Sequence, residues 1–571
     1  MSAAVTLDGE HLSIEDLVLV ARDPSIRVER DPATDEVVRR AEALIAGIVD
    51  RYKEAYGQGE TSRTVYGVTT GFGEFKDKMI HPDDLVLLQR NLLLSHSVGV
   101  GGNSDPDDRS NYFPAEVVRA ALLTRLNAFL KGNSGVRLRL VKIVQAMLNC
   151  GVVPLVPLRG SVGASGDLCP LSHLFVTLLG HGSFFLASSP ADLRPAKELA
   201  GVLRHELADL RDEEMGPTYK EGLALINGAN FSSAMLALAV NDAESLADAA
   251  DTAAAFTLEV LCGRTAALDE KVHKARRHEG QAASAKRMRD FLADSNLKDK
   301  ALAVQDAYSL RCAPQVHGAS RDAIGYARRV AENEINAATD NPLFFPDTAE
   351  SDGNGPAYSA GNFHGQPVAL AADFLAIAIA ELANISERRT QMLLDVAHNR
   401  GLPPNLTTCA GVNSGLMIAQ YTAASLVSEN KVLAHPASVD SIPTSANSED
   451  HVSMSTHAAR KARTILANAQ AVIAIEMLTT AQAADWRIGM QRPPDRLSAP
   501  MQSVAEANEE AEQFAAVTGR WRETIAPRLA PKLRAVYERI REHVPAIVTD
   551  RILDGDVRVV REMIESGSLI R

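Results

Sequence analysis

The segment from residue 220 to 263 constrains the fold more than any other part of the sequence. It runs for more than forty residues without a proline, and its apolar side chains recur at helical spacing. Similar stretches span 367–398, 413–433 and 454–486. Each is longer than the average helix of a globular protein. Because they are apolar along most of their length, they predict the buried helices of a bundle, and we expect an all-α fold.

Length and composition agree with a large helical protein. The chain has 571 residues, too many for one ordinary core. Hydrophobic residues make up 46% and aromatic residues only 5%, which favours helices over sheets. The pattern changes near residue 219, and the end of the chain is charged and amphipathic. We therefore expect an N-terminal domain (1–218), a central helical bundle (219–496) and peripheral C-terminal helices (497–571).

Charge and motif content exclude several function classes. The formal net charge is −13 and no basic tract stands out, so nucleic acid is not an expected partner. The N-terminus does not resemble a signal peptide, and no apolar stretch is interpreted as membrane-spanning, so we expect a cytoplasmic protein without a membrane partner. No metal-binding motif, phosphate loop or dinucleotide fingerprint is present in the sequence. The cysteines are scattered without paired spacing, which favours reduced thiols: Cys150, Cys169, Cys262, Cys312 and Cys409.

A run of small residues marks the loop GSVGASGDL at 160–168. Few side chains there keep a backbone nitrogen from approaching a neighbouring carbonyl carbon. Taken alone, the run is also compatible with a simple turn between two apolar segments.

The surrounding sequence, VPLRGSVGASGDLCPLSH at 156–173, resembles the prosthetic-group loop of the aromatic amino-acid ammonia-lyases and aminomutases. In that family an Ala-Ser-Gly tripeptide cyclises and loses water to give 4-methylidene-imidazol-5-one (MIO), an electrophile made from the chain itself. The resemblance implies that Gly166 supplies the attacking nitrogen, Ala164 the carbonyl and Ser165 the methylidene carbon. No external cofactor is then needed, and the N-terminal domain would carry the MIO.

A glycine-rich loop, VYGVTTGFGEF at 65–75, carries Tyr66. A tyrosine before such a loop is commonly a packing aromatic. The resemblance implies instead that Tyr66 is the catalytic base on a mobile inner loop. A phenol is a poor base at neutral pH, so this role calls for a lowered pKa.

Three further residues have a structural interpretation and one that the resemblance implies. His96, in NLLLSHSVGVG at 91–101, could be a helix-capping or core residue, and the resemblance implies that it faces the substrate ring. Asn227 could mark a helix break, and the resemblance implies hydrogen bonds to the imidazolone carbonyl region. Phe363 could be a core aromatic, and the resemblance implies a wall of the ring pocket. The chain departs from the family at Ala229-Asn230, which we expect to touch the pocket wall.

The stretch QDAYSLRCAPQVHG at 305–318 carries Tyr308, Arg311 and Gln315. An arginine among apolar residues needs a partner, because an unpaired buried guanidinium is costly. That partner could be an internal carboxylate or the carboxylate of a substrate. The resemblance implies that Arg311 binds the substrate carboxylate, with Tyr308 and Gln315 also at the substrate.

Glu449 bears on the choice of substrate. An acidic residue just before the stretch 454–486 could simply complement a helix dipole. The sequence Glu-Asp-His-Val-Ser at this point is similar to the histidine lyases, whereas phenylalanine and tyrosine lyases have Gln-Asp. A carboxylate suits a polar imidazole, but beside a neutral phenyl ring its desolvation would be uncompensated.

These motifs occur in family order from about residue 60 to 490. The resemblance implies a homotetramer whose active sites borrow residues from neighbouring subunits, an N-terminal domain above a long helical bundle, and an aromatic L-amino acid as the small-molecule substrate. With Ser95-His96 and Glu449, the expected reaction is L-histidine to trans-urocanate and ammonia. A phenylalanine or tyrosine ammonia-lyase and a 2,3-aminomutase are the alternatives within the family. A non-catalytic helical scaffold is the alternative outside it.

Overall fold

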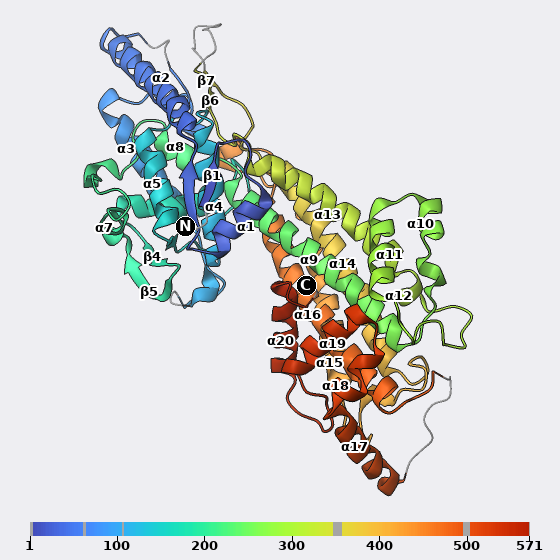
Figure 1. Cartoon of the computed structure of the whole chain (residues 1–571). Helices are drawn as coiled ribbons and strands as arrows, with labels where there is room; N and C mark the ends of the chain where they lie inside the picture. The colour runs from blue at the N-terminus through green and yellow to red at the C-terminus, as the bar shows by residue number, and fades with distance from the viewer. Residues whose placement is uncertain (1–3, 61–63, 106–107, 347–356, 495–502, 570–571) are drawn as a thin grey trace. The chain divides into compact units, whose positions relative to one another are not determined.

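The computed structural model describes residues 4–60, 64–105, 108–346, 357–494 and 503–569 (Figure 1). Helices make up most of these residues, so the expected all-α fold is confirmed. The strands are few and short. They form a parallel pair, an antiparallel three-stranded sheet and an antiparallel pair: β1 (Ala4–Leu7) with β2 (Arg27–Arg30); β3 (Val152–Pro154), β4 (Ser183–Leu186) and β5 (Ser189–Pro195); β6 (Leu343–Phe344) with β7 (Ala357–Tyr358).

The chain divides into two compact units that interleave along the sequence. Unit 1 comprises Met1–Asn241, Ala327–Asp373 and Pro436–Arg460, and unit 2 comprises Asp242–Tyr326, Phe374–His435 and Lys461–Arg571. Their boundaries cut four long helices, because each of these continues from one unit into the other: α9 (Asn230–Val260), α13 (Ala313–Ile335), α14 (Gln366–Leu394) and α16 (Ser455–Ala484). The three consecutive parts expected from the sequence stay a prediction, and their boundary at 496 lies outside the described residues.

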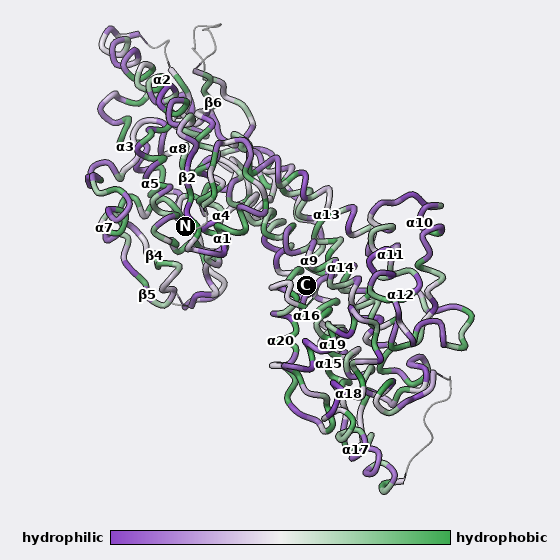
Figure 2. Tube along the Cα trace, viewed as in Figure 1, coloured by the Kyte–Doolittle hydropathy of each residue, from purple (hydrophilic) through white to green (hydrophobic). Residues whose placement is uncertain are grey.

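Unit 1 holds the three sheets and the shorter N-terminal helices: α1 (Ile14–Arg22), α2 (Pro32–Gly57), α3 (Leu85–His96), α4 (Ala115–Leu130), α5 (Leu138–Asn149), α6 (Leu168–Phe175), α7 (Leu199–Leu203) and α8 (Glu221–Ile226). Helix α4 is buried on all sides from residue 117 to 130, as expected of a core helix. Hydrophobic and hydrophilic residues alternate along α2 (Figure 2). Its buried Ile45, Val49 and Tyr52 pack with Val68 and Leu85, which joins α2 to the loop that follows it and to α3.

Unit 2 is entirely helical in its regular elements. Besides its shares of the four long helices, it contains α10 (Glu270–Arg276), α11 (Glu279–Phe291), α12 (Tyr308–Arg311), α15 (Met417–Leu433), α17 (Val504–Thr518), α18 (Trp521–Thr524), α19 (Pro531–His543) and α20 (Asp554–Glu565). On α19, buried Tyr537 and Arg541 donate hydrogen bonds to the Asp485 carboxylate at 2.5 and 2.6 Å. The C-terminal segment therefore contributes to the core of this unit.

Two helical segments are long and apolar enough to cross a membrane, by length and composition: Gln366–Leu394 and Ser455–Gly489. In their most apolar windows 67% and 78% of the residues are buried within the protein, as is typical of core helices. They correspond to two of the stretches that predicted a helical bundle.

Candidate active site

The tripeptide Ala164-Ser165-Gly166 lies in a tightly packed loop just before α6. Gly166 has a φ of +77°, and a Cβ there would lie 2.2 Å from the carbonyl carbon and oxygen of Gly228. The Gly228 N–H donates to the Ser165 carbonyl at 3.1 Å, and the Asp167 N–H donates to the Gly228 carbonyl at 2.8 Å. Only glycine suits position 166, because both its φ and its neighbour leave no room for a side chain.

The residue after the tripeptide fixes the loop to two helices. The Asp167 carboxylate is fully buried and accepts hydrogen bonds from the Ser232 N–H at 2.7 Å and the Thr456 hydroxyl at 2.6 Å. Ser232 belongs to α9 and Thr456 to α16. Burial raises the pKa of Asp167, although these donors oppose the rise. The loop is thereby held at the point where α6, α9 and α16 begin.

Glu449 reaches the tripeptide from a segment far away in sequence. The Ser165 hydroxyl donates to Glu449 Oε1 at 2.7 Å. The other carboxylate oxygen, Oε2, accepts from the Thr444 hydroxyl at 2.7 Å. Glu449 is partly buried and precedes α16 by six residues, so it lies in a loop and does not cap that helix.

Tyr66 lies over the same site, but its electrostatic environment differs from the sequence-based expectation. The Gly73 N–H donates to the phenolic oxygen at 3.3 Å, and the Phe72 ring packs edge-on with 6.3 Å between ring centroids. Burial raises the pKa of Tyr66, the Gly73 hydrogen bond lowers it, and the charge of Glu449 raises it further. The expected lowering of this pKa is therefore absent, because the described surroundings supply a carboxylate and no cation that lowers it.

His96 ends α3 with its ring held by the helix itself. Its Nδ1 lies 2.9 Å from the Leu92 carbonyl oxygen and 3.0 Å from the Ser95 hydroxyl. A carbonyl only accepts, so Nδ1 carries the proton and Nε2 is left as an acceptor in the neutral ring. Burial lowers the pKa of His96, with the Leu92 carbonyl and Glu449 acting the other way, so the neutral ring prevails at neutral pH.

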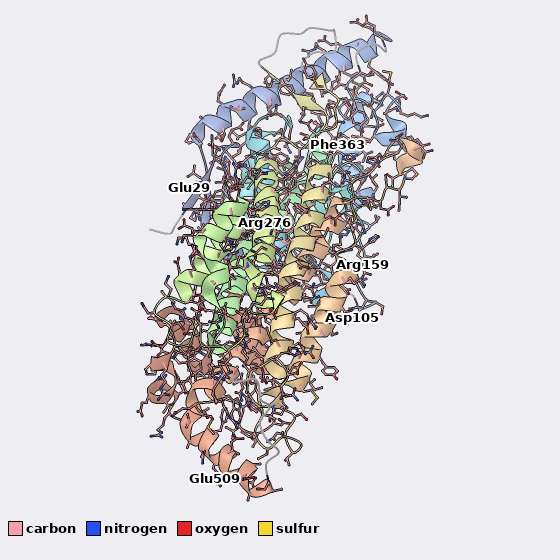
Figure 3. The ribbon with its side chains drawn as sticks, turned by 90° about the vertical axis from the view of Figure 1, so that its right-hand side faces the viewer. Glu29, Asp105, Arg159, Arg276, Phe363 and Glu509 are labelled. Carbon is pink, nitrogen blue, oxygen red and sulfur yellow. The ribbon has the colours of Figure 1, made fainter. Side chains whose placement is uncertain are left out.

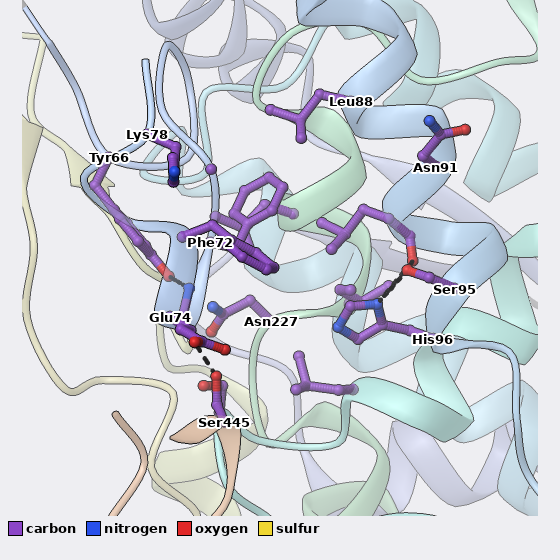
Figure 4. Close-up of a pocket in the computed structure, with 18 of the residues that line it drawn as sticks. Tyr66, Phe72, Glu74, Lys78, Leu88, Asn91, Ser95, His96, Asn227 and Ser445 are labelled. Atoms are coloured by element: carbon purple, nitrogen blue, oxygen red, sulfur yellow. Dashed lines mark hydrogen bonds between the residues drawn. The ribbon is translucent and has the colours of Figure 1, made fainter. Parts of the chain in front are cut away.

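These residues line one cavity of about 560 Å³ within unit 1 (Figure 4). Tyr66, His96, Ser165, Asn227 and Glu449 all face it. Its apolar wall is formed by Phe72, Phe75, Ile80, Leu88, Leu92, Leu168, Leu223 and Ile226. The cavity is large enough for an aromatic amino acid.

Phe363 lies on a second cavity, of about 450 Å³, also within unit 1. It precedes the start of α14 by three residues (Figure 3). The two cavities share Tyr66, Ser165, Asn227 and Glu449 as lining residues. Phe363 therefore lies on a separate cavity that borders the same four side chains.

Asn227 provides a test of whether these residues fit an imidazolone. Its side-chain oxygen, Oδ1, is buried and has no hydrogen-bond partner among the described residues. A native buried polar atom without a partner calls for a ligand or a modified group. The orphaned Oδ1 can accept only from a donor on a bound ligand, because an imidazolone formed from the tripeptide has no N–H. The glycine at 166, where a Cβ would meet Gly228, suits the close backbone approach that formation of such a ring requires.

Tyr308, Arg311 and Gln315 lie in unit 2, and none of them lines either cavity. Among the described residues Arg311 forms no ion pair. Its Nε donates to the Asp306 carbonyl at 3.2 Å and its guanidinium stacks 4.8 Å from the centre of the Tyr308 ring. Tyr308 is 71% exposed. The internal salt bridge considered from the sequence is thus absent in this part of the chain, and the guanidinium keeps donors for an external anion.

Two departures from the sequence-based picture concern the cavity walls. Ala229 and Asn230 are buried but line neither cavity, so the expectation that they touch the pocket wall is wrong. Asn230 Oδ1 instead accepts a hydrogen bond from Arg125 at 2.7 Å. Sequence reasoning also missed lining residues with polar side chains: Glu74, Lys78, Asn91 and Ser445. Glu74 lies in the glycine-rich loop of Tyr66 and Lys78 follows it, and that proximity was the available signal.

Comparison with known proteins places these observations in a wider context. The family model for aromatic amino acid lyases matches residues 12–510. A histidine ammonia-lyase of Caldanaerobacter subterraneus subsp. tengcongensis is 46% identical over 567 residues, covering 99% of this chain and 97% of that protein. The crystal structure of histidine ammonia-lyase from Trypanosoma cruzi has a TM-score of 0.78 at 36% identity, covering 99% of this chain and 94% of that one. Tyrosine aminomutase from Streptomyces globisporus has a TM-score of 0.82 at 30% identity, covering 100% and 98%.

Proposed function

The chain belongs to the aromatic amino acid lyase family, and on that premise we propose that it converts L-histidine to trans-urocanate and ammonia. One observation carries the choice of substrate: the Glu449 carboxylate lies 2.7 Å from the Ser165 hydroxyl and borders the cavity that His96 lines. A carboxylate and a neutral imidazole acceptor suit a substrate ring with N–H groups. The relatives described above as histidine ammonia-lyases support the same choice.

We infer that Ala164, Ser165 and Gly166 form the MIO group. When formed, this group supplies an electrophile that takes up the substrate amine and makes it a better leaving group. The chain holds the group through Asp167, which anchors the loop, and through the Asn227 side-chain amide, whose N–H groups can donate to the ring carbonyl. No external cofactor enters this proposal.

The other residues bind the substrate and move one proton. Tyr66 accepts the β proton, and its raised pKa means that the phenolate forms only when a positive field offsets its burial. Glu449 and His96 orient the imidazole ring, and Phe363 limits the space beside it. Arg311 binds the carboxylate, assisted by Tyr308 and Gln315.

We further propose a homotetramer with shared active sites. Arg311 belongs to unit 2, and we propose, as the family resemblance implies, that each site takes its carboxylate-binding arginine from a neighbouring chain. The cytoplasm is the proposed location, because the five cysteines are all free thiols and a reducing compartment keeps them so.

The alternatives within the family differ in substrate or in the fate of ammonia. A phenylalanine or tyrosine ammonia-lyase would place a neutral ring beside Glu449 without compensation for the desolvated charge. A 2,3-aminomutase would retain the acrylate until ammonia adds again, and the tyrosine aminomutases share this fold. Product analysis separates the three outcomes, because urocanate, a phenyl acrylate and a β-amino acid differ in absorbance and in mass.

The intact mass of the purified chain tests the MIO and the catalytic assignment together. Cyclisation and dehydration remove two waters, so we expect the wild-type chain to be lighter than its sequence by that amount. Ser165→Ala should fold with an unchanged circular dichroism spectrum, have no methylidene carbon and lose nearly all histidine turnover. A wild-type chain of full mass, or a Ser165→Ala variant with wild-type turnover, would reject the prosthetic group and favour a scaffold.

A further inference from the structure

The turn that carries Glu449 has an unusual backbone. Ser445, Ala446 and Asn447 have φ values of +49°, +51° and +65°, so three consecutive residues without a glycine lie in the left-handed region. For serine and alanine this conformation is unfavourable, because the Cβ lies too close to the following carbonyl oxygen. A turn of this kind persists only where its surroundings specify it, and it is found at functional sites.

Two residues close this turn at its base. The Thr444 N–H donates to the Glu449 carbonyl at 2.9 Å, and the Glu449 N–H donates to the Thr444 carbonyl at 3.3 Å. The side chains repeat the pairing, because the Thr444 hydroxyl donates to Glu449 Oε2 at 2.7 Å. Oε1 of the same carboxylate receives the Ser165 hydroxyl. The carboxylate is thus held at both oxygens, one toward the site and one toward Thr444.

We propose that Thr444 is a positioning residue, whose hydroxyl fixes the Glu449 carboxylate in the orientation that meets the substrate ring. The inference rests on the proposed function and goes beyond it by assigning a role to a side chain that lines neither cavity. A glutamate side chain loses considerable rotamer freedom when it is ordered. A second hydrogen bond supplies that order before substrate arrives, as preorganised sites require.

The alternative, a purely structural role in the turn, predicts a different pattern of effects. The backbone pair between Thr444 and Glu449 does not depend on the hydroxyl. Removing the Thr444 hydroxyl therefore leaves the two backbone hydrogen bonds of the turn in place and frees only the Glu449 carboxylate.

The test is a double-mutant cycle of Thr444→Val with Glu449→Gln, read as kcat/KM for histidine per chain that has lost two waters. Thr444→Val keeps the shape and removes the donor, and it should lower kcat/KM about tenfold, as expected for one hydrogen bond to a charged group. Thr444→Ser restores the donor and should stay within about threefold of the wild type. In the Glu449→Gln background Thr444→Val should have less than about a threefold effect, because its target is gone. The matched control is Thr422→Val, which removes a hydroxyl that bonds only within its own helix.

Two results would overturn the inference: wild-type kcat/KM in Thr444→Val, or an equal fold loss with and without the Glu449 carboxylate. Failure of the proposed function shows itself separately, as a wild-type preference for phenylalanine or tyrosine over histidine. The cycle is then measured with the preferred amino acid. The wild type, Thr444→Val, Glu449→Gln and the double variant are also compared by thermal unfolding, which needs no substrate. Additive shifts of the melting temperature there, without coupling between the two side chains, would likewise reject the assignment.

Discussion

Glu449 is the residue whose chemistry distinguishes the possible substrates most sharply. Its side chain is partly buried, both of its oxygens accept hydrogen bonds within the protein, and it lies close enough to affect the pKa of both Tyr66 and His96. A charge in such a place is costly unless a bound ligand or the protein compensates for it. An imidazole ring does so with an N–H donor, and a phenyl ring cannot.

We predict that Glu449→Gln discriminates between substrates. A hydrogen bond to a charged group is worth about 1.5–3 kcal/mol, or roughly one to two powers of ten in kcat/KM. Histidine turnover should fall by at least that factor, while any turnover of phenylalanine or tyrosine should stay the same or rise. The acrylate products are followed by absorbance for all three amino acids. The control is Glu270→Gln, in an exposed ion pair on α10, which should change none of them. Equal losses of kcat/KM for all three substrates would mean that Glu449 does not distinguish between their rings.

Tyr66 gives a prediction with a definite sign in pH. Burial raises the pKa of Tyr66, so the neutral phenol dominates at neutral pH and the basic form grows as pH rises. The kcat/KM of the wild type should therefore increase with pH into the alkaline range. Tyr66→Phe should bind substrate and have almost no turnover at any pH. A variant within a few-fold of wild-type kcat would mean that Tyr66 is a packing residue and that the base lies elsewhere.

At this scale the sequence predicted which residues gather at one cavity better than it predicted their surroundings. Tyr66, His96, Ser165 and Asn227 could be found from short motifs, because each motif is local. The contact between Ser165 and Glu449 joins residues 284 positions apart, and only the fold creates it. The raised pKa of Tyr66 and the orphaned Asn227 oxygen follow from burial, which motif matching does not report.

At the scale of elements, the loop of Tyr66 and the turn of Glu449 contact each other. The Glu74 N–H donates to the Ser445 hydroxyl at 3.3 Å, as the dashed line in Figure 4 shows. Gly73 has a φ of +54°, and a Cβ there would lie 2.5 Å from Ser445 Oγ. The glycine therefore permits the approach that brings Tyr66 and Glu449 to one cavity.

We expect Gly73→Ala to separate these two elements and leave the rest of unit 1 folded. The added methyl group meets Ser445 and strains a left-handed backbone, so the loop should shift and kcat/KM for histidine should fall by at least about tenfold. The melting temperature should change little, because Gly73 is only half-buried and the loop packs into the core through Val68 instead. Gly201→Ala on α7 is the matched control, since a Cβ there has no neighbour within 4 Å and no positive φ. Unchanged activity in Gly73→Ala would show that closure of the loop does not depend on this contact.

The sequence predicted the long helices well and the turn of Glu449 not at all. Helices such as α14 and α16 follow from apolar periodicity over many turns, which neighbouring residues reinforce. The left-handed turn at 445–447 contains no glycine, and local propensity argues against it. Contacts with Gly73 and the Thr444–Glu449 pair specify it instead, and these join segments that are far apart or not predictable from local sequence.

At the scale of the whole molecule, the groups expected at one active site fall in two different units. Tyr66, Ser165 and Glu449 share cavities in unit 1, whereas Tyr308 and Arg311 belong to unit 2 and line neither cavity. The sequence could not separate these sets, because all their motifs point to the same reaction. The resemblance to lyases with shared sites is what turns this separation into a statement about assembly.

Co-expression of two inactive variants tests that statement. Chains with Tyr66→Phe and chains with Arg311→Gln should each assemble into inactive homotetramers. In randomly mixed tetramers, we expect each site to take Tyr66 from one chain and Arg311 from another. About a quarter of the sites then contain both wild-type residues, because each residue is wild type in about half of the chains. About a quarter of the wild-type activity should therefore return. If both residues came from the same chain, no mixed site could be intact and no activity would return. The control is co-expression of Tyr66→Phe chains with Ser165→Ala chains. Because Tyr66 and Ser165 line one cavity of the same chain, mixing these two variants should restore no activity. Recovery of activity in this control would contradict the proposed shared-site arrangement.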